Sequence, residues 1–389
     1  PLFGVLAIIT FLCFHFVADL NFSILIGEMY RLANIPVLIA IPLFTCAGYI
    51  LAESQAPTRL VNLSRAFLGW MPGGLSIVAI LSCAVFTALT GASGVTIIAM
   101  GGLLLPALTD EGYREKFNLG LLTSSGSLGL LFPPSLPVIL YAIISTEDVN
   151  KLFVAAAVPG ILLVVILSAY CMVTAMRRNI PRHSPSWAER KKALRDAVWE
   201  MPLPFVILGG IYGGVFTASE AAAITAFYVL VVEVFIYRDV SFSQLRKIMI
   251  ESMVLVGGLI IILATALGFT NFLIDQQIPM KILEWIQTFV HSRITFLLLL
   301  NVFLLIVGCL MDIFSAIVVV VPLILPIATS FGVHPLHLGV IFLTNLEIGY
   351  NTPPVGINLF ISSFRFKKPV IKLYGATLPF LLLYLIALA

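Results

Sequence analysis

Long apolar runs separated by short polar stretches occupy the whole chain. Runs of the roughly 17–25 residues that a bilayer-spanning helix needs recur from end to end, most clearly at 153–176, 252–274 and 370–389. The strict alternation of a membrane β-barrel is not the pattern here. The hydropathy pattern therefore predicts an all-α polytopic integral membrane protein.

Breaks in the apolar pattern divide the chain into spans and hairpins. Two apolar stretches, 73–108 and 294–328, are too long for one span, and each has a polar or glycine-rich interruption at its middle. We interpret each as a re-entrant hairpin that enters and leaves the membrane on one side. The predicted full spans are 1–18, 36–54, 117–146, 152–176, 200–216, 219–237, 248–273, 338–363 and 370–389.

The positive charges test this topology, because cytoplasmic loops are enriched in Lys and Arg. The loops placed on one face carry 18 of the 22 Lys and Arg residues, and these loops are 55–72, 109–116, 177–199, 238–247 and 364–372. The other face holds Arg31, Lys151, Lys281 and Arg293. The face that carries 18 Lys and Arg residues is predicted to be cytoplasmic. Drawing either hairpin as a full span would remove this asymmetry of charge.

Composition agrees with a membrane protein and limits the other classes. Hydrophobic residues make up 60% of the chain and charged residues 11%, against about 25% charged in soluble domains. The five cysteines are scattered singly, so we expect neither disulfides nor a metal cluster. The basic stretch 177–196 is interpreted as a connector beside anionic lipid headgroups rather than a nucleic-acid site. Because the chain begins at Pro1 inside an apolar run, we expect some N-terminal sequence to precede it.

An internal repeat appears when the two halves are compared at an offset of 220 residues. Pro106 then matches Pro326, Gly129 matches Gly349, and the double proline 133–134 matches 353–354. The hairpin midpoints 90–94 and 310–314 also coincide. The predicted organisation is an N-terminal scaffold helix and loop (1–35), a first repeat (36–176), a connector with a scaffold helix pair (177–247) and a second repeat (248–389).

The charge analysis places the ends of the two hairpins on opposite sides, so the repeats are inverted in the membrane. Paired broken helices in inverted repeats are typical of secondary transporters. Breaking a helix at membrane depth is costly unless the freed backbone groups line a cavity. Such a break can bind a hard cation through oxygen ligands.

The polar residues near the four breaks are the candidate site. Around the first hairpin and break they are Thr90, Ser93, Thr96, Thr123, Ser124, Ser125, Ser127 and Ser135, and around the second Asp312, Ser315, Asn345, Glu347, Asn351, Thr352 and Asn358. Ser and Thr in membrane helices often only bond to the backbone. An ionisable residue at this depth favours a function, although Glu347 could also be a structural partner within the bundle.

Other functions have weaker support. His334 and His337 lack a third ligand for a transition metal, and no phosphate-binding GxxxxGK[ST] loop occurs. An integral-membrane enzyme needs an acid–base or Arg/His constellation in the spans, and none is readable. A passive channel suits inverted broken-helix repeats less well than alternating access does.

Seven stretches resemble the large membrane subunit of tripartite ATP-independent periplasmic (TRAP) transporters. In order they are "IAIPLFTCAGYILAES" (39–54), "GWMPGGLSI" (69–77), "FTALTGASGVTIIAMGGLLLPAL" (86–108), "LGLLFPPSLPVILYA" (128–142), "FTASEAAA" (216–223), "GCLMDIFSAIVVVVPLILPI" (308–327) and "NLEIGYNTPPVGINLF" (345–360). They span nearly the whole chain in family order, and as a set they are highly specific.

This resemblance implies a sodium-coupled importer of organic acids, such as C4-dicarboxylates or sialic acid, in the bacterial inner membrane. It also implies an elevator mechanism, a small four-helix membrane subunit and a periplasmic substrate-binding protein as partners. A stand-alone sodium/dicarboxylate symporter remains the alternative. The implied sodium sites are Ser93, Gly94, Gly126 and Pro133 for the first, and Asp312, Ser315, Asn351, Thr352 and Gly356 for the second. Candidate substrate contacts are Thr96, Ser124, Ser135 and Asn358.

Overall fold

The computed structural model describes residues 2–16, 27, 30, 34–182 and 185–388. These residues form helices and connecting turns, with no strand among them. Eight described helices are long and apolar enough to cross a membrane, or nine when one bent pair counts as a single span. The predicted fold class is therefore confirmed. Much of the predicted loop before residue 36, part of the connector at 183–184 and the last residue lie outside the described residues.

The first half contains a hairpin and a broken helix, which follow α1, η1, α3 and α4. Its tip separates α5 from α6, and its break separates α7 from α8. The elements are α1 (Leu2–Phe16), η1 (Pro36–Ile39), α3 (Ala40–Glu53), α4 (Ala56–Leu68), α5 (Gly74–Thr90), α6 (Ser93–Asp110), α7 (Glu115–Ser125), η2 (Leu128–Leu131), α8 (Leu136–Ser145) and α9 (Val149–Arg177).

The second half repeats this order after a connector. The connector contains α10 (Trp187–Asp196), α11 (Pro202–Tyr212), α12 (Ala218–Leu230) and η3 (Val231–Ile236). The repeated elements are α13 (Phe242–Asp275), α14 (Ile278–Gln287), α15 (Arg293–Leu310), α16 (Ile313–Ser330), α17 (Pro335–Gly349), α18 (Ile357–Phe366) and α19 (Val370–Leu388). The N-caps of α6 and α16, Ala92 and Asp312, differ in number by 220, the offset of the sequence repeat.

Three helices were missed by the sequence analysis, which treated their residues as loops, and they are α4, α10 and α14. Two of them, α4 and α14, carry a proline in the first turn. Both are too short to span a membrane. Each has an apolar face, and α4 packs it on α5 whereas α14 packs it on α16. Short amphipathic helices of this kind escape a search for uniformly apolar runs.

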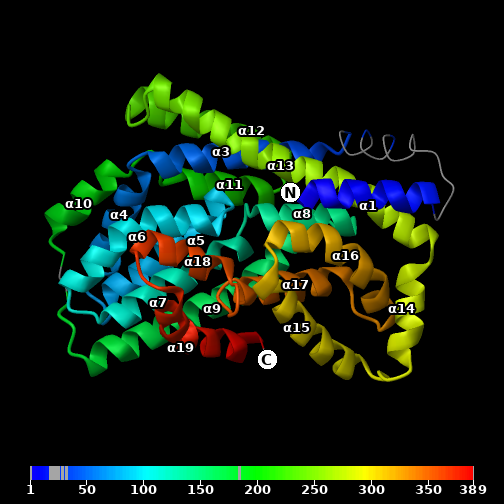
Figure 1. Ribbon diagram of the computed structural model, residues 1–389. Helices are drawn as coiled ribbons and strands as arrows, with labels where there is room; N and C mark the ends of the chain where they lie inside the picture. Colours follow the sequence, from blue (N-terminus) through cyan, green and yellow to red (C-terminus); the bar gives the residue numbers. More distant parts are fainter. Residues whose placement is uncertain (1, 17–26, 28–29, 31–33, 183–184, 389) are drawn as a thin grey trace.

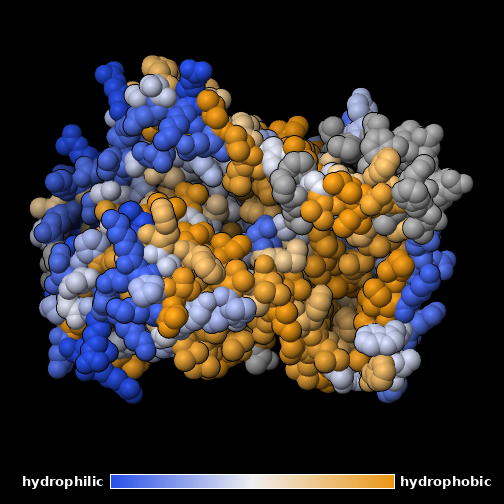
Figure 2. Space-filling view, in the orientation of Figure 1, coloured by the Kyte–Doolittle hydropathy of each residue, from blue (hydrophilic) through white to orange (hydrophobic). Residues whose placement is uncertain are grey.

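The hairpins lie beneath a layer of long helices (Figure 1). In that view α5 and α6 lie left of centre, α15 and α16 lie right of centre, and α1, α3, α12 and α13 run across the top. Within the layer α3 packs against α12 and α13, and α13 also contacts α16. The hydrophilic surface gathers on the side of α4 and α10, whereas apolar surface covers the region of α15 and α16 (Figure 2). The side rich in polar residues is the one predicted to be cytoplasmic.

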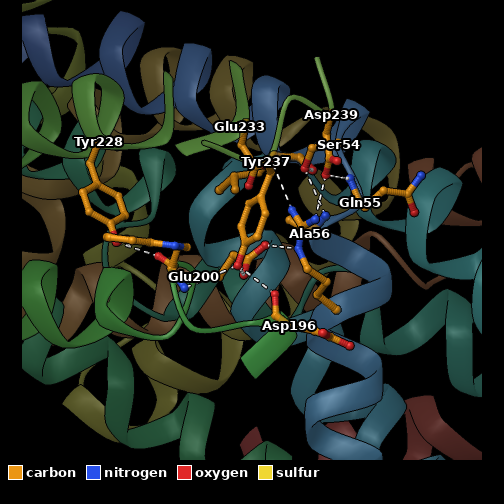
Figure 3. A network of polar contacts seen from close by, with 12 residues as sticks. Ser54, Gln55, Ala56, Asp196, Glu200, Tyr228, Glu233, Tyr237 and Asp239 are labelled. Atoms are coloured by element: carbon orange, nitrogen blue, oxygen red, sulfur yellow. Dashed lines mark hydrogen bonds and ion pairs between the residues drawn. The ribbon is translucent and has the colours of Figure 1, made fainter. Parts of the chain in front are cut away.

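An ion-pair network ties α4 to the connector. The Arg59 guanidinium contacts carboxylates of Glu200, Glu233 at 3.0 Å and Asp239 at 2.7 Å. It also lies over the Tyr237 ring, 3.9 Å from the centroid. Figure 3 shows the carboxylates and Tyr237 gathered around the start of α4. Three acidic residues of the connector thus meet at Arg59, on the side predicted to be cytoplasmic.

Candidate functional site

The two hairpin tips open onto one cavity of about 500 Å³. Ser93 and Gly94 line it from the first tip, and Asp312 and Ser315 line it from the second. The opposite wall comes from α13, through Val254, Leu255, Gly258, Leu259 and Ile262. Four predicted site residues from the two halves are therefore brought together.

A glycine shapes the first tip. Gly91 ends α5 with φ +66°, and a Cβ there would lie 2.5 Å from the Leu136 side chain. Only glycine fits both the left-handed backbone and the close approach. The chain then turns through Ala92, and Ser93 begins α6 facing the cavity. The first turn of α6 therefore presents backbone N–H groups at the tip.

The second tip uses a capping side chain and a hydrogen bond from the broken helix. The Asp312 carboxylate accepts from the Ser315 N–H at 3.0 Å and caps α16. The Ile313 N–H donates to the Tyr350 hydroxyl at 2.6 Å. Gly356, at φ +52°, donates its N–H to the Cys309 carbonyl at 3.0 Å. The tip and the second break are thus held as one unit.

Oxygen atoms cluster under the first tip. The Thr87 hydroxyl lies 2.7 Å from the Thr96 hydroxyl and 2.8 Å from the Gly126 carbonyl oxygen. All three residues come from different elements, because Thr87 is on α5, Thr96 on α6 and Gly126 follows α7. A side chain at Gly126 would meet Ile97 at 2.4 Å. Neutral oxygens in this arrangement are suitable ligands for a hard cation.

The second break is bonded to the first. The Asn351 amide donates to the Ser127 hydroxyl at 3.3 Å and to the Glu347 carbonyl at 3.2 Å, and it accepts from the Asn358 amide at 3.3 Å. Asn351, Asn358 and Ser127 are fully buried. This network joins the broken helices of both halves at their midpoints.

The remaining predicted residues lie apart from the cavity. Pro133 lines an apolar groove beside α11. The Thr352 hydroxyl donates to the Ile348 carbonyl on its own helix at 2.8 Å, and the Ser135 hydroxyl donates to the Leu130 carbonyl. Ser124 is fully buried, and its carbonyl accepts from Tyr384 at 2.8 Å. Thr352 and Ser135 thus follow the backbone-bonding interpretation for polar residues in membrane helices.

Three site features were not singled out from the sequence. Tyr350 lies inside the "GYNTPPVG" break, where the sequence does not indicate that its hydroxyl bonds to the second tip. Thr87 is one turn before the first tip, where its polar side chain in an apolar run was the only signal. The α13 wall carries no polar side chain at the cavity, so only the packing of the helices identifies it.

Comparison with known proteins decides the family. The model of the tripartite ATP-independent periplasmic transporter, DctM component, matches residues 1–389. The chain belongs to this family. It is a TRAP transporter large permease, a multi-pass protein of the inner membrane. The family consists of transporter permeases rather than enzymes.

Curated relatives and a solved structure agree with this assignment. The large permease is 38% identical to the C4-dicarboxylate TRAP transporter large permease DctM of Pseudomonas aeruginosa, over 90% of this chain and 82% of that protein. It is 33% identical to the ectoine/5-hydroxyectoine large permease UehC of Ruegeria pomeroyi, over 95% and 89%. The Alcanivorax borkumensis YdaH transporter shares the fold, with TM-score 0.65, 16% identity and coverage of 94% and 86%.

Proposed function

We propose that the large permease carries a small organic acid across the inner membrane together with sodium ions. The observation that supports this most directly is the meeting of both hairpin tips at one cavity. The first turns of α6 and α16 both line that cavity. Helix N-termini favour anions, and transporters built on broken helices use them to bind anionic groups.

The same region offers oxygen ligands for sodium. Below the first tip, the hydroxyls of Thr87 and Thr96 converge with the Gly126 carbonyl. At the second tip, Asp312 supplies a carboxylate beside Ser315. We propose a cation at each tip, which would place positive charge next to the bound anion and couple their movement.

The nature of the solute follows from relatives and chemistry together. The two relatives are named for C4-dicarboxylate and for ectoine/5-hydroxyectoine, so the family handles more than one small organic compound. The described residues that line the cavity include Asp312 but no Lys, Arg or His. Neutralisation of an acid here would therefore depend on helix N-termini and bound cations.

The mechanism that suits this geometry is an elevator. Asn351 bonds the two broken helices to each other, and Tyr350 and Gly356 bond the second hairpin to the second break. Thr87 bonds the first hairpin to the first break at the Gly126 carbonyl. Across the cavity, α13 presents apolar and glycine residues. A wall without hydrogen-bonding side chains lets a rigid unit slide past it, so we propose that α1, α3, α12 and α13 form the fixed scaffold.

The tripartite family description supports two partners, a small four-helix membrane subunit and a periplasmic substrate-binding protein. Uptake into proteoliposomes tests the proposal. The large permease would be reconstituted with the small subunit, and a candidate carboxylate offered with and without its binding protein. We expect uptake that needs both the binding protein and an inward sodium gradient. Uptake without the binding protein would instead support a stand-alone sodium symporter.

A further inference from the structure

Glu347 is a buried carboxyl without a hydrogen-bond partner. It lies in α17, one turn before the second break, and is fully buried. Neither of its carboxyl oxygens has a hydrogen-bond partner. Burying an ionised carboxylate without a compensating charge costs several kcal/mol or more. Such a group is stable inside the protein only when a cation neutralises it.

Other unpartnered oxygens belong to the same region. Thr344 lies three residues earlier on α17, on the same side of the helix as Glu347, and its buried hydroxyl also has no partner. Tyr384 of α19 interacts electrostatically with Glu347 and donates to the Ser124 carbonyl. The Ser124 hydroxyl is itself unpartnered. The described part of the bundle therefore contains two further buried hydroxyls without a hydrogen-bond partner, one on α17 and one on α7.

Side chains of the packed elements do not supply the neutralising charge. Among the described titratable groups, Tyr384 interacts electrostatically with Glu347 and with Cys83 of α5. Three titratable groups that lie on or beside elements in contact with α17 are bonded elsewhere. Tyr141 donates to the Pro335 carbonyl, Tyr374 donates to the Pro354 carbonyl, and Asp312 caps α16. No described Lys, Arg or His bonds to the Glu347 carboxyl.

We propose that Glu347 is the centre of a buried sodium site, separate from the two tips. The inference rests on the proposed ion coupling and adds a third ion-binding position to it. Asn351 connects this site to transport, because its amide bonds to the Glu347 carbonyl and to Ser127 of the other half. Loading or emptying the site would therefore act on the contact between the broken helices.

Thermal unfolding of the purified large permease tests the site without knowledge of the solute. Sodium is titrated against potassium at constant ionic strength, and the titration is repeated across the neutral pH range. The variants are Glu347→Gln and Glu347→Met, which keep the side-chain size but remove the charge. Glu233→Gln is the matched control, because Glu233 is equally buried but paired with Arg59.

The titrations separate sodium binding from the other outcomes. If sodium binds, Glu347→Gln and Glu347→Met lose part of the saturable sodium-dependent rise in Tm, and Glu233→Gln keeps it. If both Glu347 variants keep the sodium response and change only the pH dependence of Tm, no sodium ion binds at Glu347 and the proposal is overturned. If Glu347→Met does not fold, the Tm response of Glu347→Gln alone tests the proposal.

The proposal is overturned if both variants keep the wild-type sodium and pH responses. That result is distinguishable from failure of the tip sites. Asp312→Ala and Asn351→Ala report on the tip and break sites in the same titrations. A normal sodium response in those variants, together with an altered response in Glu347→Gln, would reject the tip assignment and support the Glu347 site.

Discussion

At the scale of single residues, the site depends on polar side chains that form hydrogen bonds beyond their own helix. Asn351 is the clearest example, with bonds to Ser127, Asn358 and the Glu347 carbonyl. Thr352, its immediate neighbour, bonds only to the preceding turn of its helix. Two adjacent polar residues therefore have different roles, one connecting the halves and the other satisfying local backbone.

Replacing Asn351 or Asp312 by alanine should weaken sodium binding without preventing membrane insertion. Asn351→Ala leaves Ser127 and Asn358 short of partners, which costs about 1–3 kcal/mol, and Asp312→Ala removes the carboxylate at the second tip. The measurement is the sodium-dependent rise in Tm against potassium at equal ionic strength. Thr352→Ala serves as the control and should keep the response. An unchanged response in both site variants would reject the second sodium site.

At the scale of elements, close helix contact holds the second hairpin to its broken helix. A Cβ added at Gly349 of α17 would lie 2.4 Å from the Gly308 backbone of α15. Backbone atoms cannot move aside as a flexible side chain can. Small residues at such crossings are typical of membrane helix packing. The contact explains why the sequence repeat keeps a glycine at positions 129 and 349, since Gly129 meets the α5 backbone with a similar clearance.

Gly349→Ala should destabilise the protein by about 1–3 kcal/mol, the usual effect of overpacking. The helices α15 and α17 would separate, and the second tip would shift with them. Gly257→Ala is the matched control, because nothing lies within 4 Å of a Cβ there. We expect the control to match or exceed wild-type stability, since alanine favours a helix more than glycine does. Equal Tm values for the two variants would contradict the packing argument.

At the scale of the whole molecule, the Arg59 network joins the first half to the connector on the side predicted to be cytoplasmic. Arg59 is 12% exposed and Glu200 is 7% exposed, so both charges are largely removed from water. Burial raises the pKa of Glu200, and the neighbouring Arg59 opposes that rise. Glu200 lies in the turn between α10 and α11, two residues before the helix of the predicted span 200–216 begins. The three carboxylates therefore stay close together only while the Arg59 guanidinium lies among them.

Arg59→Gln should cost about 3 kcal/mol or more, because it leaves buried carboxylates without their cation. The variant should raise the pKa of Glu200 further. An acid whose folded pKa exceeds its unfolded value loses stability as pH rises between the two values. The Tm deficit should therefore be larger at neutral than at mildly acidic pH.

Arg65→Gln is the control for this experiment. Arg65 is 40% exposed and pairs with Glu111 at 3.1 Å, and an exposed pair contributes at most about 1 kcal/mol. We expect a small deficit in this control. A deficit of Arg59→Gln that does not change with pH would show that the carboxylates remain solvated after the cation is lost.

The sequence by itself determined the positions of the spans, hairpins and breaks. These depend on local properties, because apolar length sets a span and glycine or proline interrupts it. The offset of 220 residues even matched the N-caps at Ala92 and Asp312. Short amphipathic helices such as α4 and α14 were missed, because their polar faces reduce the apolar signal.

Only the tertiary structure decided which residues meet. Asn351 bonds to Ser127 across 224 positions, and Arg59 reaches Asp239 across 180. The cavity at the tips and its α13 wall likewise arise from helices far apart in the chain. A polar residue in an apolar run shows that some partner is required, because leaving it unbonded is costly. Its identity depends on how the helices pack, which local sequence patterns do not specify.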